Sequence, residues 1–308
     1  MPTKPRNLGA SVRARLLDRA RAERSDFQVL LTRYALERLL FRLSASAHRE
    51  QFILKGAMLF ATWLANPFRP TRDLDLLGTG ADDVAAIART FRDICTINVP
   101  DDGVSFDAEA LRAEAIRANV AYGGVRVRTT ASIAGAKIPI QVDIGFGDVI
   151  TPAPVEIEYP TMLGNPPPRL RAYPVETVVA EKFEALTALG IGNTRLKDYY
   201  DLWFIAQTFS FRHSQLAEAI RRTFERRRTA IPRELPPGLS MDFAAMRKVQ
   251  WQAFLGRERM AVAPADLEQV VADLQAFLLP LALTRQVEDL AWSPAGPWLT
   301  VQTSISVR

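Results

Sequence analysis

Two stretches of alternating apolar and polar residues, 124–133 and 138–146, most strongly limit what this chain can fold into. Alternation with a period of two is typical of β-strands with one buried face, and the short connection 134–137 predicts that the two strands form a hairpin. The apolar residues at 138, 140, 142 and 144 give the second strand a buried face, and Asp143 lies on its other face. We therefore expect a sheet that presents Asp143 on its polar side.

The whole chain is predicted to be an α+β protein, in which a mixed part precedes a helical part. Helices are expected over 8–24, over 27–43 with Asp26 as the N-cap, over 81–94 and over 109–118, and strands over 73–77 and 104–107. Pro160 and the prolines of 166–168 mark a linker. Further helices are expected over 175–189, 197–208, 213–228, 241–255 and 265–279, followed by an irregular tail after Arg285. We predict N-terminal helices in 1–45, a core of a mixed sheet with flanking helices in 46–165, and an all-helical domain in 166–308.

Composition excludes several classes of protein. With 308 residues, of which 48% are hydrophobic, the chain can bury a sizeable core, and no apolar run approaches the length of a membrane span. The single cysteine, Cys95, excludes an internal disulfide framework and a cysteine zinc site, and two histidines are too few for a multi-histidine metal site. We expect a protein of the reducing cytoplasm that has no membrane partner.

Two acidic residues, Asp73 and Asp75, lie in the predicted strand 73–77 and share one of its faces. Neighbouring carboxylates repel each other unless a cation lies between them, and Mg²⁺ prefers such oxygen ligands. Asp143 would add a third carboxylate if its strand pairs beside this one, and Asp148 is the alternative for that place. A strand edge with two solvated aspartates is the other interpretation of the pair.

The segment Lys55–Gly56–Ala57 has the features of a phosphate-binding turn. A glycine between a strand and a helix lets backbone amides approach a phosphate, and Lys55 adds a positive charge. The order of this turn, the Asp73–Asp75 pair and the later Asp143 resembles the nucleotidyltransferase fold of the DNA polymerase β type. Ala57 stands where that fold's pattern has glycine or serine, so backbone amides and Lys55 would bind the phosphate.

The helical part contributes another set of charged residues. Lys182 lies beside the apolar face of the helix 175–189, and Asp198 and Asp201 share a face of the next helix because they are three residues apart. A lysine and an aspartate so placed could orient a nucleotide, and a helix pair joined by ion pairs is the alternative. The neighbouring aromatic residues are more typical of a core than of a base-stacking surface: Tyr199, Tyr200, Trp203 and Phe204.

Together, the motifs LKGA, RPTRDLDL, VDIGFGD, AEK and RLKDYYD resemble those of the AbiEii/AbiGii-type nucleotidyltransferase toxins, a group that includes the MenT toxins. The resemblance covers about residues 30–290. It implies a bacterial toxin of a toxin–antitoxin, abortive-infection type system. It also implies an enzyme that uses Mg²⁺ and an NTP to add NMP to RNA, above all to the 3′ end of tRNA, and so blocks translation.

The resemblance also implies a role for each residue that matches a motif. Asp73 and Asp75 would hold Mg²⁺, with Asp143 as a further ligand that also holds the attacking 3′-hydroxyl. Lys182 and Asp198 correspond to the third and fourth motifs of the family and complete the catalytic set. Residues expected to bind the nucleotide are Lys55, Gly56, Ala57, Thr71, Arg72, Lys182, Lys197 and Asp201.

The expected partners are a cognate antitoxin and an RNA substrate, and the chain itself is expected to be a monomer. The antitoxin would be of the winged-helix type or a kinase-like protein that acts on Thr71, whose hydroxyl could instead bond its own backbone in a turn. The arginine-rich segment 221–228 is a candidate RNA contact, or else a solvated helix end. Two other functions stay open: nucleotide transfer to a protein or small molecule, and non-catalytic binding of a partner.

Overall fold

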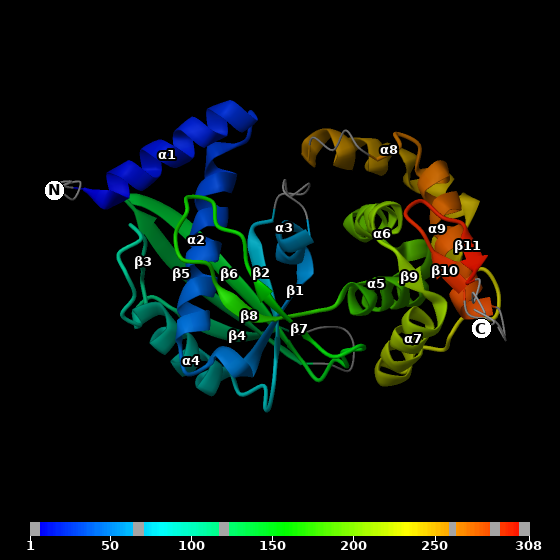
Figure 1. The fold of residues 1–308 in the computed structure, drawn as a ribbon, viewed down its shortest axis with the longest axis horizontal. Helices are drawn as coiled ribbons and strands as arrows, with labels where there is room; N and C mark the ends of the chain where they lie inside the picture. The colour runs from blue at the N-terminus through cyan, green and yellow to red at the C-terminus, as the bar shows by residue number, and fades with distance from the viewer. Residues whose placement is uncertain (1–6, 64–70, 117–122, 259–262, 284–289, 302–308) are drawn as a thin grey trace, which may run out of the picture. The chain divides into compact units, whose positions relative to one another are not determined.

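The computed structural model describes residues 7–63, 71–116, 123–258, 263–283 and 290–301 (Figure 1). The chain forms two compact units, one of residues 1–148 and 154–173, and one of residues 149–153 and 174–308. The predicted α+β fold class is confirmed, with a mixed sheet in the first unit and a helical region in the second. The predicted domain limits at residues 45 and 165 stay predictions.

The first unit is built on an eight-stranded sheet in the order β3-β5-β6-β2-β1-β8-β7, with β4 paired to β5. Its strands are β1 (Phe52–Lys55), β2 (Asp73–Gly78), β3 (Ser105–Phe106), β4 (Arg112–Ile116), β5 (Gly124–Ile133), β6 (Ala136–Phe146), β7 (Val155–Glu158) and β8 (Arg169–Ala172). The predicted hairpin is confirmed as β5 and β6, which are joined through Ala134 and Gly135 with positive φ of 47° and 81°. Strand β2 lies next to this hairpin in the sheet, where it pairs parallel with β6 and antiparallel with β1.

The helices of this unit are α1 (Leu8–Glu23), α2 (Phe27–Ala45), the short α3 (Phe60–Trp63) and α4 (Val84–Thr96). Asp26 caps α2 as predicted, because its side chain accepts a hydrogen bond from the amide of Val29 at 3.1 Å. Helices α2 and α4 pack on the sheet on the side of its buried residues (Figure 1). Those residues include Ile140, Val142 and Ile144, which are at most 2% exposed. The polar residues of the same strands therefore line the other side.

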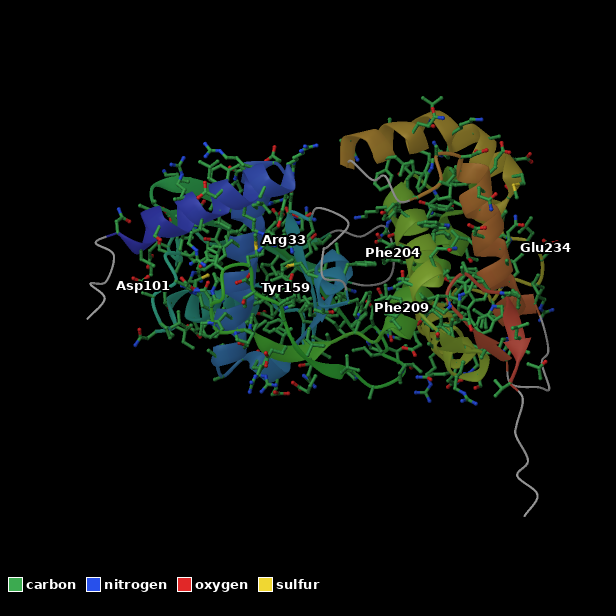
Figure 2. All side chains as sticks on the ribbon, turned by 45° about the horizontal axis from the view of Figure 1, so that its top comes forward. Arg33, Asp101, Tyr159, Phe204, Phe209 and Glu234 are labelled. Atoms are coloured by element: carbon green, nitrogen blue, oxygen red, sulfur yellow. The ribbon has the colours of Figure 1, made fainter. Side chains whose placement is uncertain are left out.

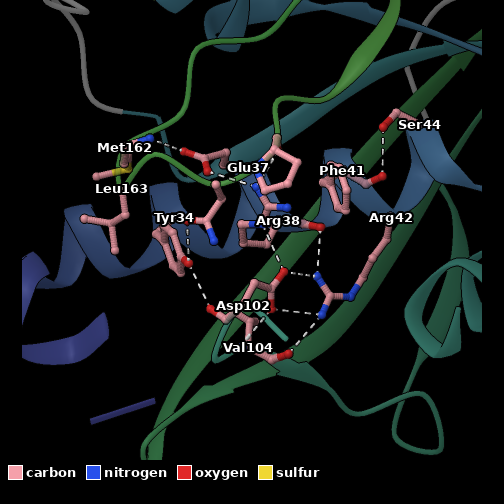
Figure 3. A network of polar contacts seen from close by, with 12 residues as sticks. Tyr34, Glu37, Arg38, Phe41, Arg42, Ser44, Asp102, Val104, Met162 and Leu163 are labelled. Carbon is pink, nitrogen blue, oxygen red and sulfur yellow. Dashed lines mark hydrogen bonds and ion pairs between the residues drawn. The ribbon is translucent and has the colours of Figure 1, made fainter. Parts of the chain in front are cut away.

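A buried ionic network joins α2 to two loops of the first unit (Figure 3). Arg38 and Arg42 donate to the carboxylate of Asp102 at 2.9 Å and 2.7 Å, and Glu37 accepts from the amide of Met162 at 2.8 Å. Burial by itself would raise the pKa of Asp102, but the hydrogen bonds and charge of Arg42, together with hydrogen bonds from Arg38 and the Val104 amide, outweigh it and lower that pKa. The network fixes the chain around residues 102 and 162 against the helix.

The segment predicted to be a linker, marked by Pro160 and the prolines 166–168, connects β7 to β8. These two strands pair with each other, and β8 continues the sheet beside β1. Between these strands, Tyr159 is 3% exposed, and Arg33 of α2 lies in the same region (Figure 2). Burial raises the pKa of the Tyr159 hydroxyl, and the positive charge of Arg33 opposes the shift. The prolines thus lie in the connection between two paired strands.

The prediction of a helix over 109–118 is wrong. Residues 112–116 form β4, which pairs antiparallel with β5. The segment has several good helix formers, including Leu111, Ala113 and Glu114, but pairing with the long strand β5 overrides this local preference.

The second unit contains α5 (Val175–Leu189), α6 (Leu196–Thr208), α7 (His213–Arg227), α8 (Met241–Glu258) and α9 (Leu267–Leu283). These agree with the five predicted helices. The unit is not all-helical, however, because β9 (Phe211–Arg212), β10 (Leu290–Trp292) and β11 (Trp298–Thr300) form a small sheet. The tail predicted to be irregular thus contains two strands, and its residues 286–289 and 302–308 lie outside the described part.

The aromatic residues of α6 belong to the core of this unit, as predicted. Tyr199 and Tyr200 are 0% exposed, and the ring of Tyr199 stacks on Phe243 at 4.8 Å between centroids. The indole nitrogen of Trp203 donates to Asp273 at 2.9 Å. Packing, rather than base stacking, accounts for these side chains.

Candidate active site

A row of four charged residues crosses the polar side of the sheet. Lys55 of β1 lies opposite Asp75 of β2, Asp75 lies beside Asp143 of β6, and Asp143 lies opposite Arg126 of β5. Residues in register on neighbouring strands share a face, so these four side chains leave the sheet on the same side. The expected pairing of the Asp143 strand beside the Asp73–Asp75 strand is therefore present. The carboxylates of Asp75 and Asp143 lie in the middle of the row, with a basic side chain, Lys55 or Arg126, at each end.

Gly56 holds the end of this row against the turn that follows β1. Its φ of +73° is in the left-handed region, which favours glycine. A Cβ at this position would lie 2.1 Å from a carboxylate oxygen of Asp75 and 2.6 Å from the Asp75 Cβ. The Asp75 side chain thus packs directly on the backbone of Gly56, which begins the 3₁₀ turn Gly56–Leu59, and Ala57 is the second residue of that turn.

Lys55 forms an ion pair with Asp148, the alternative third carboxylate. Its Nζ lies 3.0 Å from Asp148 Oδ2, and the side chains are 17% and 12% exposed. A Cβ on Gly145 would lie 3.4 Å from this Nζ, so the absence of a side chain there leaves space for the lysine. Asp143 is in register with Asp75, whereas Asp148 contacts Lys55 from beyond the end of β6. The structure brings both aspartates to the site.

Arg126 is a site residue that the sequence did not single out. Its Nε and Nη2 donate to the two oxygens of Asp143 at 2.7 Å and 2.6 Å, a bidentate pair. The hydrogen bonds from Arg126 to Asp143 raise the pKa of the guanidinium. The available signal was the alternation of β5, which places Arg126 and Arg128 on the polar face.

The residues at the start of β2 are the most exposed members of the site. Asp73 is exposed and lies beside Gln141 in register, and Arg72 is exposed in the loop before it. The Thr71 hydroxyl donates to the carbonyl of Asp73 at 3.0 Å and accepts from the Asp73 amide at 3.4 Å. These bonds correspond to the turn interpretation of Thr71, and phosphorylation of this residue stays a prediction.

Lys182, Asp198 and Asp201 form a second charged group, which belongs to the second unit. The Nζ of Lys182 lies 2.6 Å from Asp198 and 2.9 Å from Asp201, whose side chains are both 1% exposed. Arg195 also contacts Asp198 at 2.9 Å, whereas Lys197 points to the exposed side of α6. Burial alone would raise the pKa of Asp198, but the charges of Lys182 and Arg195 outweigh it and lower that pKa. The expected proximity of Lys182 and Asp198 is present.

The sequence model of the family described as "Nucleotidyl transferase AbiEii toxin, Type IV TA system" matches residues 38–273. This match spans most of the chain and contains both charged groups. The chain belongs to the AbiEii nucleotidyltransferase toxin family. It is therefore a nucleotidyltransferase of the toxin type, and the type IV system to which the family belongs includes a cognate antitoxin.

Two solved structures resemble this AbiEii member. A candidate nucleotidyltransferase from Helicobacter pylori has a TM-score of 0.43 and 16% sequence identity, with coverage of 83% of this chain and 96% of the other. The protein JHP933 from Helicobacter pylori has a TM-score of 0.40 and 16% identity, and the coverage is 83% and 93%. The comparison with curated proteins gives no match.

Two carboxylates of this AbiEii chain suit a hard divalent cation. Asp73 and Asp75 supply the oxygen donors that Mg²⁺ uses together with substrate phosphates. Among the described residues, no group of three His, Cys, Asp or Glu side chains is arranged to hold a metal ion. Arg126 donates one hydrogen bond to each oxygen of Asp143, and each oxygen keeps a lone pair for one further partner. The residues present therefore fit a two-carboxylate site that substrate phosphates complete.

The arginine-rich end of α7 is engaged in ion pairs. Arg221 and Arg222 both bind Glu218, at 2.8 Å and 2.6 Å, and Arg227 binds Glu181 and Glu184 at 3.1 Å and 3.0 Å. Hydrogen bonds from the two arginines lower the pKa of the half-buried Glu218 to about 2. Arg221 and Arg222, each 51% exposed, agree with the interpretation as a solvated helix face, whereas the ion pairs of Arg227 with Glu181 and Glu184 are largely buried.

None of the helices that the structure describes has the length and apolar character to span a membrane.

Proposed function

We propose that this AbiEii nucleotidyltransferase transfers NMP from an NTP to the 3′-hydroxyl of an RNA, with tRNA as the main acceptor, and that it depends on Mg²⁺. The observation that carries the proposal is the row Lys55–Asp75–Asp143–Arg126, with Gly56 packed on Asp75. The row offers acids where a cation and a hydroxyl are needed, and a lysine and a glycine turn where phosphates are needed.

Each residue of the row, as well as Asp73 and the Gly56 turn, has a distinct task in this proposal. Lys55 and the backbone of the Gly56 turn bind the phosphates that leave as pyrophosphate. Asp73 and Asp75 would hold Mg²⁺, which supplies charge neutralisation at the triphosphate when it is bound. Asp143 accepts a hydrogen bond from the attacking hydroxyl and thereby orients it. Arg126 positions Asp143, because two parallel hydrogen bonds fix the plane of its carboxylate.

A labelling experiment tests the proposal and its alternatives. The purified protein is incubated with Mg²⁺ and each α-labelled NTP in turn, together with total RNA or with total protein, and the labelled product is separated. We expect label on RNA. Label on protein alone would support transfer to a protein, and absence of both NTP binding and label would support a non-catalytic binding protein.

Variants link the labelling to the site. Asp73→Ala is expected to lower turnover at least about 10²-fold, the usual effect of losing one key electrostatic group. The matched control is Asp18→Ala, which removes a 75%-exposed aspartate from α1 of the same unit. Wild-type turnover of the Asp73 variant would contradict the assignment.

The third carboxylate is tested in the same assay by comparing Asp143→Asn with Asp148→Asn. We expect the Asp143 variant to lose turnover at constant NTP affinity, because its carboxylate acts on the acceptor hydroxyl. The Asp148 variant is expected to weaken NTP binding, because Lys55 loses the partner that positions it. The reverse pattern would exchange the two roles.

A further inference from the structure

A second row on the polar side of the sheet ends in two arginines. Asp73 of β2 lies beside Gln141 of β6, Gln141 lies opposite Arg128 of β5, and Arg128 lies opposite Arg112 of β4. This row is two residues along each strand from the row of Asp75 and Asp143, so its side chains leave the same face. Arg112 and Arg128 therefore form a basic pair on the β5–β4 side of the acidic residues.

The fold gains little from placing these two arginines together. Like charges directly opposite each other on a sheet are destabilising. Arg128 pairs with Glu114, but the side chains are 50% and 57% exposed, and such exposed ion pairs contribute little to stability. Arg112 donates to the backbone carbonyls of Glu109 and Leu111 at 3.2 Å and 3.0 Å and has no carboxylate partner among the residues described. An anionic ligand would stabilise the pair.

The geometry of the reaction indicates which anion this is. In phosphoryl transfer the attacking and leaving oxygens lie roughly in line on opposite sides of phosphorus. The phosphates that leave are assigned to Lys55 and Gly56 at β1, on one side of the acidic residues. The acceptor hydroxyl must then approach from the other side, toward β6 and β5, where Arg128 lies. Arg126 also lies on β5, but its Nε and Nη2 already donate hydrogen bonds to Asp143.

The spacing also suits the strand that carries the hydroxyl. Neighbouring strands are about 4.8 Å apart, so the Arg128 backbone is about 10 Å from that of Asp73, and Arg112 is one strand further. If the terminal nucleotide lies at Asp73, the long side chains of Arg128 and Arg112 can reach from these positions to the phosphates that directly precede that nucleotide in the RNA strand. Guanidinium groups bind such phosphates through paired hydrogen bonds.

We propose that Arg112 and Arg128 form a binding surface for the backbone phosphates of the RNA acceptor strand, next to its terminal nucleotide. The proposal rests on the proposed function, because it takes RNA as the acceptor. It assigns RNA affinity to two residues to which the proposed function gives no contact with the NTP or with the site aspartates Asp73, Asp75 and Asp143. Loss of the pair should therefore weaken RNA binding and leave NTP binding unchanged.

The test uses the full-length double variant Arg112→Gln/Arg128→Gln and a short 5′-fluorescein RNA with a free 3′-hydroxyl. By fluorescence anisotropy, we expect RNA affinity to fall at least about 10-fold, since each charged hydrogen bond contributes strongly. The slope of log K against log salt should decrease in magnitude by about 1.4, the value for two phosphates of a single strand. Affinity for a fluorescent NTP and the unfolding midpoint in urea should not fall.

The matched control is Arg221→Gln/Arg222→Gln, which removes two exposed arginines bound to Glu218 in α7. We expect this variant to bind the RNA like the wild type. Unchanged RNA affinity and salt slope in the Arg112/Arg128 variant, or an equal loss of NTP affinity, would overturn the proposal while wild-type labelling of RNA upholds the proposed function. A wild type that neither binds nor labels RNA would overturn both.

Discussion

Replacing Gly56 by alanine tests how the turn and the acidic residues depend on each other. In Gly56→Ala the new Cβ would lie 2.1 Å from Oδ2 and 2.6 Å from Cβ of Asp75, at a φ of +73°. The second distance matters most, because the Asp75 Cβ cannot move by rotation of its own side chain. Either the turn or β2 has to shift. Gly164 offers a matched control, since its φ is +74° and nothing lies within 4 Å of the position that its new Cβ would take.

The two variants separate backbone strain from the steric clash. An L-residue in the left-handed region costs about 1–2 kcal/mol, so Gly164→Ala should lose about that much stability. Gly56→Ala should lose a further 1–3 kcal/mol or so, the usual range for a side chain forced into a packed site. Turnover should fall at least about 10²-fold in the Gly56 variant, because Asp75 is displaced, and stay near the wild-type value in the Gly164 variant.

Both quantities are measurable on the same preparations. Urea-induced unfolding followed by circular dichroism gives the stability difference, and NTP-dependent labelling of RNA gives turnover. Equal destabilisation of the two variants, together with wild-type turnover of Gly56→Ala, would refute the reasoning, because it would mean that Asp75 does not depend on the turn. Loss of turnover with no extra loss of stability would place the effect in the phosphate contacts of the turn instead.

Three further predictions concern buried ionisable groups. Lys182→Met leaves Asp198 and Asp201 without their shared lysine, so the free energy of unfolding measured in urea should fall by about 3–5 kcal/mol. A loss below about 1 kcal/mol would contradict this prediction. Because the pKa of Asp198 is lowered on folding, its contribution to stability is present above its ordinary pKa of 3.8 and is lost as pH falls toward the folded value. Asp198→Asn should therefore reduce the acid dependence of the unfolding midpoint, and an identical pH profile would contradict this. Burial raises the pKa of the Cys95 thiol to about 12, so iodoacetamide should modify it only after unfolding, as mass spectrometry would show.

The parts of the fold that could be predicted are those whose signal is local. The hairpin of β5 and β6, the N-cap Asp26 and the helices of the second unit each have a periodic pattern within their own residues. The Asp73–Asp75 pair and Asp143 were found because alternation fixes which residues share a face. Pairing of β2 with β6 then places the three aspartates near one another.

The parts that could not be predicted depend on partners far along the chain. Residues 112–116 have helical composition, and only their pairing with β5 makes them a strand. Arg126 is an ordinary polar-face residue until Asp143 is placed beside it by the register of the hairpin. Arg38, Arg42 and Asp102 form a buried network across 60 residues or more of sequence, and no local pattern marks a buried charge.

The geometry of the acidic residues is controlled by the apolar face of the same strands. A slip of one residue between β2 and β6 would place Asp75 beside Val142 or Ile144 and turn it toward the opposite side of the sheet. It would also expose Leu74 and Leu76, which are at most 1% exposed. Because burying those side chains is strongly favourable, the register that brings Asp75 and Asp143 together is the one that the core requires. The position of the site is thus a consequence of core packing, and the chemistry depends on which polar residues occupy the other face.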